Sequence, residues 1–239
     1  GAPPQKRRTE GGTPPQKRRT EGARSFRMSN PLSFVTLFCR SKSLAYFTIA
    51  QAMQKMTSPI KSLWHVMSYQ VQQIIKFTPM ENGRLLMFEG LGFMLGTSFT
   101  KKFLPLLDDS MFVLLTNCMA AGMFLLRSFA RDTSQASRLF FMSSLLPMIV
   151  GMQNQVVVDS HAMERGIKSG MGKGECSANL DNVNALIYIF APQLWGNLYN
   201  RNNFLPFYVA SSITLLSYIP FYLGLKAAEH EDAAHHEQQ

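Results

Sequence analysis

The sequence predicts an all-α, multi-pass integral membrane protein with six transmembrane helices, chiefly because of three long uncharged stretches. Twenty residues without a charge run from Leu139 to Val158, nineteen run from Asn182 to Asn200, and Phe204 to Leu225 is also uncharged. An α-helix rises about 1.5 Å per residue, so about 20 residues cross a hydrocarbon layer about 30 Å thick. A chain of 239 residues has room for about six or seven such helices and their loops.

The six predicted helices differ in how clearly hydropathy marks them. They span residues 43–69, 83–104, 110–129, 137–158, 176–199 and 203–225. The third, fourth and sixth are clear from hydropathy alone, whereas Lys55 and Lys61 interrupt the first helix and Glu89 interrupts the second. After the fourth helix, charged side chains and four glycines predict a compact loop over residues 159–174.

Both ends of the chain are polar. Residues 1–29 are predicted to form a disordered basic tail, because the same nine residues occupy 3–11 and 14–22 and offer no apolar side chain to bury. The repeat is consistent with a polybasic patch for anionic lipid, with a kinase site at Thr9 and Thr20, and also with a tandem duplication that has no function. Residues 1–27 carry +6 of the net charge of +9, so the charge does not predict a nucleic-acid-binding fold. Residues 229–239 are predicted to form a polar C-terminal tail.

Polar residues in the first predicted helix share one face. Six of them recur at intervals of three or four residues, namely Gln51, Lys55, Ser58, Ser62, His65 and Tyr69. A lysine at the bilayer centre costs about 2.5–3.5 kcal/mol, so this face is expected to turn towards protein or a water-filled cavity. A solvated amphipathic helix of a soluble protein would show the same spacing. Pro59, within the stripe, is expected to kink the helix.

Two other features place polar groups in apolar surroundings. Glu89 stands alone in an apolar segment, where it is expected either to couple proton movement or to pair with Lys55. Gln153 and Asn154 interrupt the fourth predicted helix and are expected to bind a ligand or a neighbouring helix. Close to Glu89, Gly92 and Gly96 form a Gly-x-x-x-Gly step that predicts close helix packing.

The segment around the fifth predicted helix contains three short motifs in order, Gly174-Glu175-Cys176-Ser177-Ala178-Asn179-Leu180, then Ile187 to Pro192, then Trp195-Gly196-Asn197-Leu198-Tyr199. Together they resemble the eleventh helix of major facilitator superfamily transporters. Residues 30–42, which include Asn30-Pro31-Leu32, resemble the end of the central cytosolic linker of that family. The resemblance implies that residues 43–228 are the C-terminal six-helix half, made of two inverted three-helix repeats, and that the chain is a fragment. An order of polar, mixed and apolar helices occurs in 43–129 and again in 137–225, as such repeats would show.

The resemblance implies transport of a small solute by alternating access, as part of a secondary carrier. Its partners would be the lipid bilayer, the solute, with or without a coupling ion, and a second six-helix half. The candidates for the substrate cavity are Gln51, Lys55, Ser58, His65, Gln153 and Asn154, with Glu89 as coupling or ion-pair group. The alternative is a non-transporting membrane scaffold or regulatory remnant. It is favoured by the absent N-terminal half and by residues 96–102, where this chain keeps Gly96 and the basic pair Lys101 and Lys102 but lacks the acid and the second glycine of the family.

Enzyme and cofactor patterns match poorly. Asp159, Ser160 and His161 are the residue types of a hydrolytic triad, but they are neighbours in sequence, and triads assemble from distant positions. The three cysteines have no metal-ligand spacing. The sequence therefore predicts no catalytic residue, no metal and no cofactor.

Overall fold

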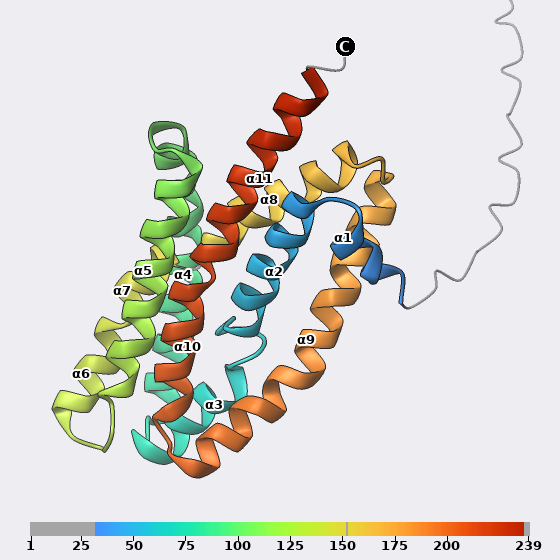
Figure 1. Cartoon of the computed structure of the whole chain (residues 1–239). Helices are drawn as coiled ribbons and strands as arrows, with labels where there is room; N and C mark the ends of the chain where they lie inside the picture. The colour runs from blue at the N-terminus through green and yellow to red at the C-terminus, as the bar shows by residue number, and fades with distance from the viewer. Residues whose placement is uncertain (1–31, 152, 237–239) are drawn as a thin grey trace, which may run out of the picture. The chain divides into compact units, whose positions relative to one another are not determined.

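A computed structural model describes residues 32–151 and 153–236, and within these ranges the chain forms helices and no strand (Figure 1). The predicted basic tail at 1–29 lies outside the described residues. Two short turns, η1 (Ser33–Val35) and α1 (Thr36–Cys39), come first. They are followed by α2 (Lys42–Met56), α3 (Trp64–Tyr69), the π-helical turn η2 (Gln70–Ile74), α4 (Pro79–Phe103), η3 (Leu104–Leu106), α5 (Asp109–Ser128), α6 (Gln135–Ser143), α7 (Leu145–Gly151), α8 (Asn154–Lys168), α9 (Lys173–Arg201), α10 (Leu205–Leu216) and α11 (Tyr218–His236).

The helices pack against one another in pairs that are distant in sequence. Helix α5 lies against α7 and α10, α2 lies against α8 and α11, and α4 lies against α7 (Figure 1). A Cβ atom added at Gly92 would contact the side chain of Ile149, and one added at Gly96 would contact the Ile149 carbonyl and the Gln153 side chain. The predicted close packing at this glycine step is therefore confirmed, with α7 as the partner helix.

Three helical stretches in the described ranges are long enough and apolar enough to cross a membrane. They are Asp109–Ser128, Gln135–Lys168, of which residue 152 is not described, and Leu205–Ala234, and they overlap the third, fourth and sixth predicted helices. Helices α4 and α9 have 25 and 29 residues, which is sufficient length, but their composition is more polar. Composition and length alone therefore support three membrane-crossing helices.

The first predicted helix, residues 43–69, is broken in the middle. Helix α2 ends at Met56, α3 begins only at Trp64, and Pro59 lies between them. A proline has no N–H to donate and its ring clashes with the preceding turn, so a helix does not continue through it without distortion. The polar stripe consequently loses its common face: Ser58 is buried, whereas His65 and Tyr69, beyond the break, are exposed.

The predicted loop over residues 159–174 is mostly helical, which corrects the sequence prediction. Helix α8 runs on to Lys168, where Lys168 pairs with Glu164 one turn earlier at 2.9 Å. The charged residues that were predicted to form a loop therefore belong to an amphipathic helix, α8. The loop is short and includes Gly170, whose φ of +87° lies in the region that glycine tolerates best. The C-terminal residues predicted as a tail also continue α11 as far as His236.

A buried polar layer separates two apolar cores. One core contains the large side chains Phe124, Phe141, Trp195 and Phe207, and the other contains Phe47, Phe112 and Phe221. Along α5, buried Asn117 lies between Phe112 of one core and Phe124 of the other. Gln54 of α2 and Asn154 of α8 are buried at the same level, since both donate to Asn117. Buried Thr214 of α10 joins them through Thr57, whose hydroxyl accepts from Thr214 and donates to the Gln54 carbonyl.

Helix α4 begins with a capping box. The hydroxyl of Thr78 accepts a hydrogen bond from the Glu81 backbone N–H, and the Glu81 carboxylate accepts one from the Thr78 backbone N–H at 2.7 Å. The backbone N–H and hydroxyl of Thr78, with the nearby Arg138, hold the pKa of the Glu81 carboxyl below its usual value. The cap therefore favours the ionised carboxylate.

Candidate functional site

A cavity of about 170 Å³ lies where the helices break. Residues from the segment after α2, from the end of α7 and from the start of α8 line it, together with residues of α4, α5, α9 and α10. We call it the central cavity. Its lining includes Ser58 and Pro59 from one break, and Gly151 and Asn154 from the other. Both interruptions of helical structure therefore open onto the same space.

Asn117 is the centre of the hydrogen bonds beside this cavity. Its Oδ1 accepts from Gln54 Nε2 at 3.3 Å and from Asn154 Nδ2 at 2.9 Å, and its Nδ2 donates to Ser217 Oγ at 3.1 Å. A buried amide that loses its partners costs about 1–3 kcal/mol, so this set fixes the relative positions of α2, α5, α8 and the α10–α11 junction. Gln54 Oε1 is buried without a hydrogen-bond partner among the described residues.

Lys55 stands between the central cavity and a second cavity. Its ammonium group donates to Asp159 Oδ2 at 2.8 Å and to Gln155 Oε1 at 2.9 Å. Asp159 lines the second cavity, which has a volume of about 400 Å³ and which we call the side cavity. Lys55, Lys61 and Tyr188 line both cavities, so these three side chains form the wall that the two share.

Glu89 pairs with Arg127, and the expected pairing of Glu89 with Lys55 is wrong. The Arg127 guanidinium is completely buried, and its Nη2 lies 3.6 Å from the Glu89 carboxylate. Its Nε donates to Ser144 Oγ at 3.0 Å, and its guanidinium carbon lies 4.9 Å from the centre of the Phe141 ring. The sequence could not distinguish these pairings, because it does not show which of the cations on other helices lies opposite Glu89.

The remaining predicted site residues divide into two groups. Gln51 is buried and lines the side cavity, and Ser58 lines the central cavity. His65 is exposed and lines neither, since the break before α3 turns it outward. Gln153 is buried but contacts α4 instead of either cavity, where its Oε1 accepts from the Thr100 hydroxyl at 3.2 Å. Of the six cavity candidates, four therefore line one of these two cavities.

Sequence reasoning missed Asn117 and Arg127. Both lie on the face of α5 that also carries Ala120 and Phe124, at successive spacings of three, four and three residues. A single amide and a single cation on an otherwise small and apolar face were the available signal. Arg127 instead looked like a charge at the end of a membrane helix, because sequence does not show that α6 and α7 fold back over it.

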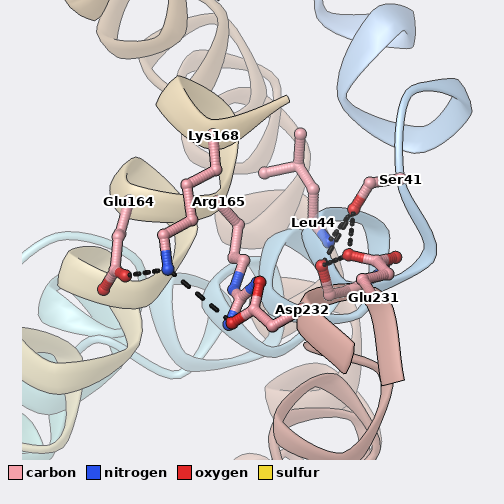
Figure 2. A network of polar contacts seen from close by, with 8 residues as sticks. Ser41, Leu44, Glu164, Arg165, Lys168, Glu231 and Asp232 are labelled. Atoms are coloured by element: carbon pink, nitrogen blue, oxygen red, sulfur yellow. Dashed lines mark hydrogen bonds and ion pairs between the residues drawn. The ribbon is translucent and has the colours of Figure 1, made fainter. Parts of the chain in front are cut away.

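A charged cluster at the end of the domain ties α11 to α8 and to the start of α2 (Figure 2). Arg165 donates from both terminal nitrogens to the Asp232 carboxylate, at 2.7 and 2.8 Å. Glu231 accepts from the hydroxyls of Ser41 and Ser43. Because these side chains bond to one another, the cluster holds three helix ends together.

The lining of the central cavity offers groups that can bind a ligand. They are two ammonium groups, several neutral hydrogen-bonding side chains and an apolar part. In the part of the chain that the structure describes, no three His, Cys, Asp or Glu side chains gather closely enough to hold a metal ion.

Comparisons of the whole chain with protein-family models, with curated proteins and with solved structures found no match.

Proposed function

We propose that this chain is the C-terminal half of a major facilitator-like secondary carrier, with six membrane-crossing helices in two three-helix repeats. In this proposal α2 with α3, α4, and α5 form one repeat. The helices α6 to α8, then α9, then α10 with α11 form the other. The three apolar stretches, the resemblance of residues 174–199 and the doubled order of polarity support it. The solute would cross the membrane through a site between this half and a second one.

The central cavity is the observation that carries the proposal. It lies at interruptions in the first element of each proposed repeat, at Thr57–Leu63 in one and beside Gln153 in the other. Interrupted helices at corresponding positions of two repeats are the usual place of a transporter's binding site, near the bilayer midplane. The buried polar layer at the same level supports this placement, because polar groups inside a membrane domain are costly unless they serve a purpose.

Exposed apolar side chains on α4 and α9 support the need for lipid and a second half. Met87 and Met94 of α4 are 56% and 70% exposed, and Phe190 of α9 is 63% exposed. Apolar surface of this extent is unfavourable in water. Lipid would cover part of it, and a second six-helix half would cover the rest.

Access to the central cavity from both sides of the membrane tests the proposal without knowledge of the solute. Cys39 and Cys118 are exposed and Cys176 is buried, so all three are first replaced by serine or alanine. Ser58→Cys then places one thiol at the cavity, and a membrane-impermeant maleimide is applied to vesicles of either orientation. A carrier exposes its site alternately, so this cysteine should react from both sides.

Lys102→Cys, at the end of α4, is the matched control and should react from one side only. Reaction of Ser58→Cys from a single side, or release of the protein from membranes by carbonate, would refute the carrier. The alternative, a non-transporting scaffold, is favoured by the missing acid and second glycine in residues 96–102. A scaffold needs no change of access, so the same labelling separates the two functions.

A further inference from the structure

The charge of the central cavity is entirely positive. Lys55 and Lys61 line it, and no acidic side chain is among the described residues of its lining. Lys61 has no carboxylate partner within the described ranges, and its ammonium group rests 4.8 Å from the centre of the Tyr188 ring. Two cations at the wall of a confined, partly buried space attract a negatively charged ligand.

The rest of the lining adds neutral donors, one unused acceptor and an apolar surface. Phe93, Met123 and Phe124 provide the apolar part. Gln54 provides the buried Oε1 that has no described partner. An engineered cavity of about 150 Å³ is large enough to hold benzene, so a cavity of about 170 Å³ suits a ligand of about six or seven non-hydrogen atoms.

The two partners of the Lys55–Asp159 bridge differ in exposure. The Lys55 side chain is 13% exposed and the Asp159 side chain is 39% exposed. Both side chains line the side cavity, but if the bridge opens the more exposed Asp159 is solvated more easily, so the less exposed Lys55 is the partner that a replacement anion stabilises more. Asp159 also bonds through one oxygen only, since its Oδ1 has no described hydrogen-bond partner.

We propose that the solute is a small organic carboxylate that also carries a hydroxyl or N–H donor, and that it displaces Asp159 as the partner of Lys55. This inference rests on the proposed carrier function. The carboxylate lies between Lys55 and Lys61, the donor reaches Gln54 Oε1, and the apolar part contacts Phe93 and Phe124. The Lys55–Asp159 bridge lies in the wall between the two cavities, so a ligand that binds and breaks this bridge opens the wall in the same step.

Ligand binding to the detergent-solubilised full chain tests the inference without requiring transport. The probes are 2-hydroxyisobutyrate, its neutral amide 2-hydroxyisobutyramide, isobutyrate and inorganic phosphate, and binding is measured by calorimetry and by the shift in Tm. The hydroxy acid should bind most tightly, isobutyrate more weakly, and the amide not measurably. Equal binding of acid and amide, or binding of phosphate alone, would overturn the assignment.

Two substitutions at the bridge should act in opposite directions. Lys55→Gln removes a charged hydrogen-bond donor to the ligand and should weaken binding about tenfold or more. Asp159→Asn removes the competitor and should tighten binding, which loss of a merely structural bridge would not do. Lys102→Gln, an exposed lysine away from both cavities, should leave binding unchanged.

The affinity of Asp159→Asn for the carboxylate tests whether the ligand replaces Asp159 as the partner of Lys55. Unchanged or weaker binding refutes this exchange. Failure of the inference is distinguishable from failure of the proposed function. Two-sided labelling of Ser58→Cys without carboxylate binding refutes only the solute class. Carboxylate binding with one-sided labelling refutes only the carrier.

Discussion

The buried pair of Glu89 and Arg127 allows a quantitative prediction. Two unit charges 3.6 Å apart attract each other by about 1 kcal/mol in water and by about 4.6 kcal/mol at an effective dielectric of about 20. Arg127 is fully buried and Glu89 is 21% exposed by side chain, so the interaction lies between these limits. Removing one member of a buried pair costs about 3–5 kcal/mol, because the other charge is left uncompensated.

Glu89→Gln should therefore lower the free energy of unfolding by about 2–3 kcal/mol, somewhat less than for a completely buried pair. Its effect should nearly vanish in an Arg127→Met background, where no buried cation remains to be compensated. The measurement is equilibrium unfolding of the protein in mixed micelles, followed by far-UV circular dichroism. Glu175→Gln, an exposed glutamate on α9, is the control and should change the free energy by less than about 0.5 kcal/mol.

The double-mutant cycle of Glu89 and Arg127 can refute the assigned pairing. If Glu89→Gln and Arg127→Met act additively to within about 0.5 kcal/mol, the two charges do not interact and the assigned pairing is wrong. A loss on Glu89→Gln that is the same in both backgrounds would mean that Glu89 contributes through packing alone.

Three further predictions concern stability. Gly151→Ala should destabilise the protein by about 1–3 kcal/mol in the same unfolding measurement, since its new Cβ would meet the α5 backbone at 2.6 Å. Gly122→Ala, which meets nothing within 4 Å, should be neutral or stabilising, and the reverse order would contradict this packing. The Glu81 carboxyl has a folded pKa below its unfolded value of about 4.3, so its contribution is complete above that pH and is lost as the pH falls through the folded pKa. Glu81→Gln should remove this part of the acid dependence of Tm, and an unchanged profile would argue against the cap. Trp195→Phe removes the donor to the Met56 carbonyl and should cost about 1–3 kcal/mol, whereas Trp64→Phe, at a side chain 39% exposed, should cost much less, so equal losses would exclude a role for this bond.

Hydropathy predicted three apolar helices well, because it depends only on local composition, whereas the uncharged stretch 182–200 lies in α9, which is not among the three. The stretches around 110–129, 137–158 and 203–225 are the ones that the structure also contains as long apolar helices. Lys55 and Ser58 were found from the spacing of polar residues in 43–69, and Asn154 from its polarity within 137–158, and all three line the central cavity. Their partners could not be predicted, since spacing identifies the face of one helix but not the helix opposite.

Of the two candidates that line neither cavity, His65 is explained by helix phase. His65 shares a face with Lys55 only if one continuous helix connects them, and the segment Thr57–Leu63 is not part of α2 or α3. The presence of Pro59 in the sequence predicts a distorted helix, but a proline at this position is compatible with either a kink or a complete break. The sequence does not distinguish them, because the difference depends on which groups elsewhere can satisfy the freed backbone.

In this structure, two side chains satisfy the backbone carbonyls that the break leaves free. After α2 ends, the indole N–H of Trp195 donates to the Met56 carbonyl at 3.0 Å, and the hydroxyl of Ser62 donates to the Lys55 carbonyl at 2.7 Å. A buried carbonyl without a donor would cost about 1–3 kcal/mol, so a break without these partners would be unstable in an apolar interior. The same turn places Lys55 and Ser58 at the central cavity. The donors that stabilise the break therefore also hold the polar site in position, which explains why the cavity lies at the break and not beside a regular helix.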